Sequence, residues 1–504
     1  MNSFASRSVI AAITGALTLS TAASAQNPED FTGLLRPRVF DSQTQSYWTL
    51  EERMAHHNVP GIAVAVIEDG AVIYAEGFGL QQRGGDTPVD GDTLFSVGSV
   101  SKVATAALAL RLHEAGVLDI DAPVASQLSS WAMPDQPEYD ESEVTMRMIL
   151  AHTAGFNLHG FGDFQPGEDL PSVYDTLNGA SPARHDPLQL TFAPGSEYRY
   201  SGGGYTLAQL LIADVSGESF EDIARSALFE PLGMTRSDFT NPLPESRGNI
   251  ARAHDRSGEA AALPRGYEAM PETAASGLWT SSSELGEMVA ALIGAYRGDG
   301  DFLSQATATD MMTRIAPSQH GLGPRIEGAG EGYFFHHAGA NNSYHTWIEG
   351  HLVTGDGLVV LTNGARGNGL HMEIRNAVAD AMGWQINQPV SAPAPSFDTA
   401  HFADFVGRYT VDPDFPLALR QQMSRYAFDA DWMVDAGENG LSMGLAGREG
   451  RAELLPLSPN RFIIDGFAMR EGVVEAEFHR NARGEVESLV LHVANAQTRY
   501  LPVD

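Results

Sequence analysis

The chain has 504 residues, of which 43% are hydrophobic and 19% charged, and it contains no cysteine. This composition indicates a folded protein long enough for more than one domain. The lack of cysteine excludes disulfides, thiol nucleophiles, zinc–thiolate sites and iron–sulfur clusters. With 64 acidic against 31 basic side chains, the formal net charge is −33, which disfavours binding to nucleic acid or to an anionic membrane surface.

Residues 1–25 have the form of a secretory signal peptide. Arg7 supplies a short basic region, residues 9–19 are apolar, and Ala23-Ser24-Ala25 has the small-x-small pattern of a cleavage site. The alternative is a membrane anchor, but the apolar run is shorter than a bilayer-spanning helix requires. We therefore expect cleavage near Ala25 and a periplasmic or secreted protein with no membrane span.

Residues 31–388 are predicted to form one large domain of α and β structure. The turn Asp69-Gly70 joins two strands at its start, and two more strands lie near its end. Strands at both ends with helices between them predict an antiparallel sheet with a helical insertion. The predicted strands are 61–68, 71–76, 344–349 and 357–362, and the predicted helices are 99–115, 206–215, 220–228, 283–296 and 372–382.

A linker and a second domain are predicted after residue 388. Residues 389–400 form the linker, whose first part is rich in proline, alanine and serine. Residues 401–504 differ from the first domain in pattern, because short strand-like runs alternate with turn residues. The runs are 405–410, 440–445, 452–457, 461–464, 473–478 and 485–493, and they predict a small all-β barrel.

Ser99-Val100-Ser101-Lys102 is an S-x-x-K motif at the start of a predicted helix. Three residues are nearly one helical turn, so the Lys102 amine is within reach of the Ser99 hydroxyl and can take its proton. The motif alone is equally compatible with a helix cap and a solvated lysine. However, Lys102 is the only lysine in the chain, and lysine, unlike arginine, can lose its proton in a protein site.

Two further segments are candidates for the same site. Tyr200 precedes Ser201-Gly202-Gly203-Gly204, and a phenol presented by a glycine-rich loop beside an ammonium can act as a base. Alone, this segment is more typical of a packing tyrosine. His337-Ala338-Gly339-Ala340 precedes a predicted strand, where small residues let a substrate backbone approach an exposed N–H group. An ordinary turn with a surface histidine is the alternative.

Metal and cofactor chemistry is not predicted. Two histidine pairs, His56-His57 and His336-His337, are candidate metal ligands, but surface or turn roles are more typical of such pairs. His113-Glu114 lacks the spacing of a zinc-binding helix, and we find no phosphate-binding loop or dinucleotide fingerprint. We therefore expect neither a cofactor nor a metal.

The order of these segments resembles that of the serine hydrolases that include class C β-lactamases, type-B D-Ala-D-Ala carboxypeptidases and esterases. Four further segments match this family in family order over about Gln45 to Met382. They are 118–124 (LDIDAPV), 148–155 (MILAHTAG), 231–234 (PLGM) and 359–363 (VVLTN). Residues 402–409 (FADFVGRY) resemble the start of the lipocalin-like barrel that follows some of these hydrolases.

The resemblance implies a two-lobed fold, with an antiparallel sheet region, a helical lobe and the site between them, followed here by the all-β barrel. It implies that Ser99 is the acylated nucleophile and that Lys102 and Tyr200 share proton transfer. It also implies an oxyanion hole from the backbone N–H groups of Ser99 and Ala340, with His337 and Gly339 on the substrate-binding strand.

Two departures from the family pattern affect the expected substrate. The family's Tyr-Ser-Asn is Tyr200-Ser201-Gly202 here, so a side-chain amide is missing. The Lys-Thr-Gly of penicillin-recognising enzymes is His337-Ala338-Gly339, which weakens the cation and removes the hydroxyl. Both groups serve the substrate carboxylate, so we expect a small ester, amide or peptide substrate in place of efficient antibiotic hydrolysis.

Three hypotheses follow from the sequence. The first is a serine esterase or peptidase that forms an acyl-enzyme. The second is a β-lactamase or D-Ala-D-Ala carboxypeptidase, and the third is a binding or scaffolding protein that keeps the fold without catalysis. The intact Ser99, Lys102 and Tyr200 argue against the third hypothesis. The sequence does not give the oligomeric state.

Overall fold

The computed structural model describes residues 26–40, 45–134, 138–164, 167–261, 272–391, 397–416, 431–437, 440–447, 451–469, 472–493 and 496–503. The predicted signal peptide lies outside the described residues. Within the described ranges, every helix is too short or too polar to span a bilayer.

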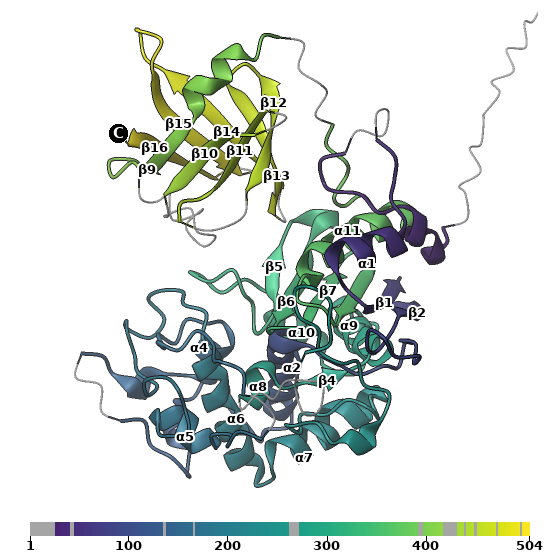
Figure 1. The fold of residues 1–504 in the computed structure, drawn as a ribbon. Helices are drawn as coiled ribbons and strands as arrows, with labels where there is room; N and C mark the ends of the chain where they lie inside the picture. Colours follow the sequence, from purple (N-terminus) through teal and green to yellow (C-terminus); the bar gives the residue numbers. More distant parts are fainter. Residues whose placement is uncertain are drawn as a thin grey trace, which may run out of the picture.

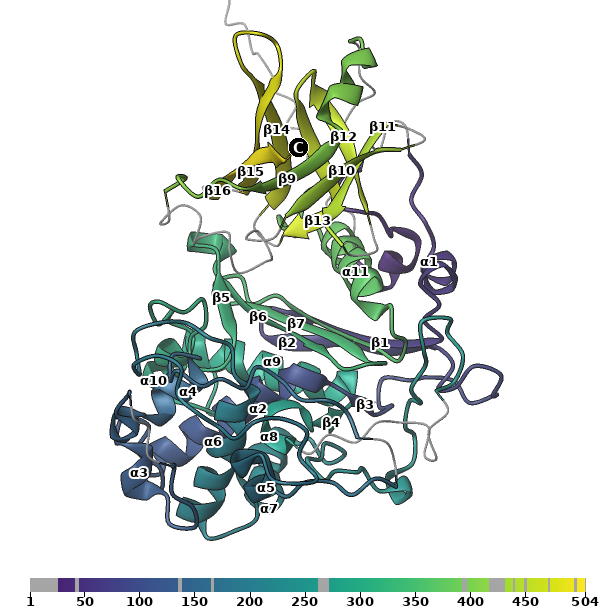
Figure 2. The same cartoon turned by 60° about the vertical axis from the view of Figure 1, so that its left-hand side comes forward.

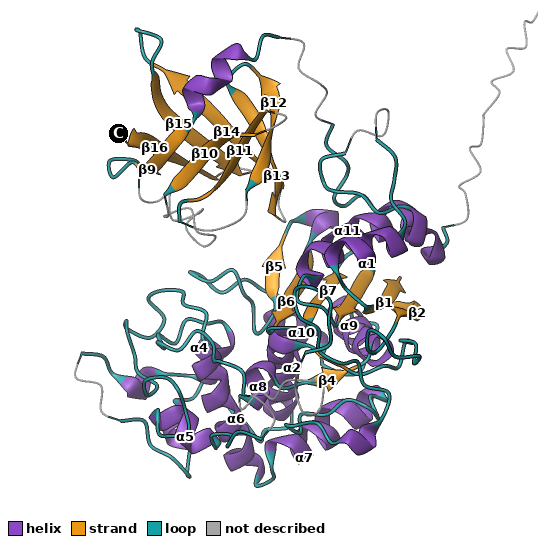
Figure 3. Ribbon diagram, viewed as in Figure 1, coloured by secondary structure: helices purple, strands orange, loops and turns teal. Residues whose placement is uncertain are grey.

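An antiparallel six-stranded sheet forms the centre of the first domain (Figure 1, Figure 3). Its order is β2-β1-β8-β7-β6-β5, so strands from the two ends of the domain pair in the middle of the sheet. This confirms the antiparallel sheet with a helical insertion. The strands are β1 (Gly61–Glu68), β2 (Ala71–Gly79), β5 (Arg325–Glu327), β6 (Phe334–Ala340), β7 (His345–His351) and β8 (Gly357–Thr362).

Helices cover both faces of this sheet, as Figure 2 shows with the sheet near edge-on. Side chains alternate between faces along a strand. Consequently Ile62 and Val64 of β1 pack in one cluster with helix α11 (Gly367–Met382). Ala63 and Ala65 pack in the other cluster, with α9 (Ser282–Arg297). Burial on both faces explains why β1 reads as a continuous apolar run.

The helical lobe occupies the chain between the two halves of the sheet, drawn in blue and teal in Figure 1. This part of the chain also forms a short two-stranded sheet, β3 (Phe95–Ser96) with β4 (Trp279–Thr280). Helix α1 (Leu50–His57) precedes the sheet. The helices between β2 and β5, besides α9, are α2 (Ser101–Glu114), α3 (Val124–Gln127), α4 (Met146–Leu150), α5 (Val173–Asn178), α6 (Gly202–Ser216), α7 (Phe220–Ala224), α8 (Thr273–Ser276) and α10 (Gln305–Met311). The helix predicted over 220–228 is divided, since α7 ends at Ala224 and a π-helical turn follows.

A closed eight-stranded barrel forms the second domain and confirms the predicted all-β architecture (Figure 1). It has its own apolar core, separate from those of the first domain. Two of its strands, β10 and β16, are absent from the prediction, and both pair with β9 to close the barrel. The strands are β9 (Gly407–Val411), β10 (Trp432–Gly437), β11 (Gly440–Leu445), β12 (Ala452–Ser458), β13 (Arg461–Met469), β14 (Gly472–Arg480), β15 (Val486–Val493) and β16 (Ala496–Val503).

A buried ion pair joins the sheet to α11. Glu349 of β7 is fully buried and pairs with Arg375 of α11, which is 2% exposed. The Trp347 indole N–H donates to the same carboxylate at 3.1 Å. Burial alone raises the pKa of the Glu349 carboxyl, but the Arg375 charge and the neighbouring His351 side chain lower it to about 2.

Replacing Arg375 with methionine is expected to destabilise the protein by roughly 3–5 kcal/mol at pH 7, because Glu349 becomes an uncompensated buried charge. The folded-state pKa of Glu349 lies below its ordinary value of 4.5. The pair therefore stabilises the wild type above pH 4.5, and this contribution is lost as the pH falls towards 2. Urea unfolding at pH 7 and pH 4 measures both effects. Arg225→Met, which breaks an exposed pair, is the control and should change stability by less than about 0.5 kcal/mol.

Candidate active site

Ser99 lies in a 3₁₀ turn, Gly98–Val100, immediately before α2. The Ser101 hydroxyl stabilises this turn, because it donates to the Gly98 carbonyl at 2.6 Å and accepts the Leu278 N–H at 2.9 Å. Ser99 itself is half-buried. The turn therefore presents one serine hydroxyl from a rigid base at the start of a buried helix.

Lys102 is in the first turn of α2 and is 2% exposed. Its Nζ donates to the Ser99 Oγ at 3.2 Å and to the Ala275 carbonyl at 2.8 Å. The amine is thus held between a backbone oxygen and the serine hydroxyl. This is the arrangement in which a lysine can exchange a proton with a serine nucleophile.

Tyr200 is half-buried beside the same amine, with its ring centroid 4.9 Å from the Lys102 Nζ. The glycines after it do not form the predicted loop, since Gly202 to Gly204 make the first turn of α6. Ser201 caps that helix by accepting the Gly204 N–H at 3.0 Å. A side chain at Gly202 would meet the Phe161 ring. The helix can therefore begin at Gly202 because glycine has no side chain.

The His337–Ala340 segment lies inside strand β6, and His337 is 3% exposed. Its end packs directly against the Ser99 turn. A Cβ atom at Gly98 would lie 2.8 Å from the Ala340 N, and one at Gly339 would lie 3.3 Å from the Ser99 N. Glycine is therefore required on both sides, and the backbones of Ser99 and Ala340 come close together.

Four imidazoles surround the Tyr200 ring. Ring centroids lie 4.2 Å away for His152, 5.2 Å for His159, 6.0 Å for His320 and 6.3 Å for His337. Burial lowers the pKa of His152, His159 and His320, and the Lys102 charge lowers those of His152 and His159 further. In the described part of the chain no three histidine or acidic side chains are grouped so as to hold a metal ion.

Glu272 is a buried acid next to the site, and no sequence motif marks it. It is 2% exposed and directly precedes α8, the helix whose Ala275 carbonyl binds Lys102. One carboxylate oxygen accepts the Ser276 hydroxyl at 3.2 Å. Burial raises the pKa of Glu272 to about 7, against the lowering influence of the Lys102 charge.

The pH dependence of folding stability is expected to change in Glu272→Gln. The folded-state pKa is raised above its ordinary value of 4.5, so ionisation of Glu272 costs stability as the pH rises from 4.5 through 7. The variant should therefore gain up to about 3 kcal/mol relative to the wild type between pH 5 and pH 8. Urea unfolding at both pH values tests this, and parallel pH profiles for the two proteins would contradict it.

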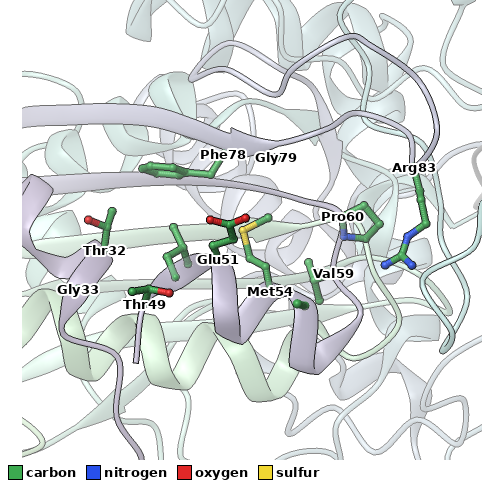
Figure 4. Close-up of a pocket in the computed structure, with 12 residues that line it drawn as sticks. Thr32, Gly33, Thr49, Glu51, Met54, Val59, Pro60, Phe78, Gly79 and Arg83 are labelled. Atoms are coloured by element: carbon green, nitrogen blue, oxygen red, sulfur yellow. The ribbon is translucent and has the colours of Figure 1, made fainter. Parts of the chain in front are cut away.

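A cavity of about 790 Å³ lies between α1 and the β1–β2 hairpin (Figure 4). Its walls include Met54, Val59 and Phe78, and its charged residues are Glu51 and Arg83. None of the candidate catalytic side chains lines it. It is therefore not part of the Ser99 site.

Comparison with known proteins identifies the family of this chain. The Beta-lactamase family pattern matches residues 49–382. Penicillin-binding protein 4 of Amycolatopsis lactamdurans is 31% identical over 198 residues, which cover 39% of this chain and 49% of that protein. The chain thus spans about half the length of that relative. Esterase EstB of Burkholderia gladioli is 27% identical over 318 residues, covering 56% of this chain and 76% of the esterase.

Solved structures show the same fold. A class C β-lactamase from Rhodobacter sphaeroides superposes with a TM-score of 0.51 at 21% identity, covering 66% of this chain and 97% of that one. An octameric penicillin-binding protein homologue from Pyrococcus abyssi covers 89% of this chain and 98% of its own, with a TM-score of 0.54 at 21% identity. The fold is that of the β-lactamases and penicillin-binding proteins, with an added barrel. The chain belongs to the Beta-lactamase family.

Proposed function

We propose that this protein is a serine hydrolase that cleaves ester or amide bonds through a covalent acyl-enzyme on Ser99. The observation that carries the proposal is the 3.2 Å hydrogen bond from the buried Lys102 amine to the Ser99 hydroxyl. Penicillin-binding protein and esterase relatives support it.

In this proposal the Ser99 Oγ attacks the substrate carbonyl carbon, and its proton passes to the pair formed by Lys102 and Tyr200. The oxyanion of the tetrahedral intermediate accepts the backbone N–H groups of Ser99 and Ala340. The bond to the leaving group then breaks, and the leaving group takes the proton. A water molecule hydrolyses the acyl-serine in the second half of the reaction and regenerates the hydroxyl.

The substrate is proposed to lack a carboxylate next to the scissile bond. Gly202 offers no side-chain amide, and the space beside it is taken by Phe161. In place of a family lysine, His337 directs its Nδ1 to the Ala338 carbonyl at 2.7 Å. These two replacements favour an ester or a peptide over a β-lactam or a D-Ala-D-Ala peptide.

Intact-mass spectrometry after three incubations tests the proposal. A fluorophosphonate should add one adduct, which maps to Ser99, and a short-chain nitrophenyl ester should be turned over. A penicillin should leave the mass unchanged or react slowly. If the fluorophosphonate leaves Ser99 unmodified and no ester is hydrolysed, a binding or scaffolding role replaces the proposal. Rapid penicillin turnover would favour the β-lactamase alternative.

The hydrolase domain is proposed to fold without the barrel, so that residues 31–388 and 401–504 form separate domains. Val390 forms a β-bridge with Val39, and the Phe40 N–H donates to its carbonyl at 2.9 Å. A chain truncated after Ser391 keeps this bridge and is expected to retain ester hydrolysis within about threefold, since each domain has its own core. Thermal melting and an esterase assay test this, and an unfolded truncated chain would contradict it.

A further inference from the structure

His152 lies two residues beyond the end of α4 and has an unusual backbone conformation. Its φ is +61°, in the left-handed region that few residues other than glycine, asparagine, aspartate and histidine adopt. The side chain is 2% exposed. Such a conformation persists only where the surroundings fix it, and it is often found at functional sites.

His152 accepts two hydrogen bonds, one from the residue on each side of Tyr200. The His152 carbonyl accepts the Arg199 N–H at 2.9 Å. Its ring Nδ1 accepts the Ser201 N–H at 3.1 Å, which places the ring proton on Nε2. The carbonyl and the ring of His152 therefore fix the backbone at Arg199 and Ser201, the two neighbours of Tyr200.

The His152 ring also packs on the phenol itself. The two ring centroids are 4.2 Å apart with 32° between the planes. His320 also packs against the His152 ring, at 4.8 Å and nearly perpendicular, and its Nδ1 donates to the Gly323 carbonyl at 2.8 Å. Burial and the Lys102 charge keep His152 neutral by lowering its pKa. The ring thus supports Tyr200 without adding a second cation beside Lys102.

We propose that His152 is a positioning residue, which fixes the Tyr200 phenol where it can share a proton with Lys102 and Ser99. This inference rests on the proposed hydrolase function. A displacement of about 1 Å at a reacting group can cost on the order of a hundredfold in rate. The expected consequence of losing His152 is therefore a fall in kcat with little change in KM.

Two substitutions separate this role from general support of the fold. In His152→Ala both the ring and the acceptor are lost, and kcat per titrated active site should fall by about ten- to a hundredfold. Asparagine tolerates the left-handed conformation and places an amide oxygen near the position of Nδ1. His152→Asn should therefore recover at least about fivefold of that loss in kcat. KM for the nitrophenyl ester should stay within about threefold in both variants.

His254→Asn is the matched control. His254 is fully buried, donates from Nδ1 to the Asn363 carbonyl at 2.9 Å and accepts the Arg83 N–H at 3.0 Å. It is also a buried histidine that bonds the backbone, but its partners lie outside the Ser99 site. This variant should lower the melting temperature and keep kcat per titrated site near that of the wild type.

A double-variant cycle gives the decisive result. If His152 acts through the phenol, His152→Ala should lower the residual kcat of Tyr200→Phe by less than twofold, whereas it lowers that of the wild type about ten- to a hundredfold. An equal effect in both backgrounds would overturn the proposal, as would His152 variants that lose only stability. Fluorophosphonate labelling of Ser99 in the wild type tests the hydrolase proposal separately, so the two hypotheses can fail independently.

Discussion

Replacement of Ser99 by alanine is expected to reduce hydrolysis of every substrate of this protein by on the order of 10⁴-fold or more. The hydroxyl is half-exposed on a rigid 3₁₀ turn and accepts a hydrogen bond from the buried Lys102 amine at 3.2 Å. Without it no acyl-enzyme can form, and the remaining amine and backbone N–H groups stabilise only a direct attack by water. The fluorophosphonate adduct should disappear with the activity.

The fold of this variant should be unaffected, because the turn depends on Ser101 and not on Ser99. Thermal melting checks this. Ser304→Ala is a suitable control, since Ser304 caps α10 by accepting the Thr307 N–H at 3.2 Å. It should cost about 1 kcal/mol of stability and leave activity intact. A Ser99→Ala protein with near-wild-type activity would show that another group is the nucleophile.

Local sequence was sufficient for the strands at the centre of the sheet. The predicted bounds of 61–68 and 357–362 are those of β1 and β8, because strands buried on both faces are apolar throughout. The barrel strands β10 and β16 were not predicted. Their local pattern is weak, with an aspartate in Trp432–Gly437 and a proline in Ala496–Val503. Each pairs with β9 as well as with its neighbour in sequence, β11 for β10 and β15 for β16.

The residues of the candidate site could be predicted where they belong to a recognisable sequence motif. Ser99, Lys102 and Tyr200 are found together, as are His337 and Ala340 on β6. Glu272 was not predicted, since no motif distinguishes an acid that is buried only by the tertiary fold. His152 lies in the matched segment 148–155, but its position beside Tyr200 was not predicted, because neither its positive φ nor its hydrogen bond to Ser201 is visible in the sequence.

Lys102→Arg is expected to lower kcat/KM by about a hundredfold or more while the protein still folds. The proposed mechanism needs an amine whose proton can move, and a guanidinium does not lose its proton near neutral pH. The surroundings of Lys102 also fit an ammonium group, in which one nitrogen atom makes both hydrogen bonds. The Nζ contacts the Ser99 hydroxyl on one side and the Ala275 carbonyl, at 2.8 Å, on the other. A planar guanidinium in this buried position displaces at least one of them.

Small amines distinguish loss of proton transfer from loss of packing. Lys102→Ala leaves a space beside Ser99, so methylammonium should restore part of its activity, and more as the pH rises and the free amine increases. Lys102→Arg should not respond, because the guanidinium fills that space. Since Lys102 is the only lysine in the chain, reductive methylation of the wild type modifies only this amine and the N-terminus. If Lys102→Arg melts normally and hydrolyses an ester at near-wild-type rate, Lys102 is a structural cation and proton transfer must pass through Tyr200 alone.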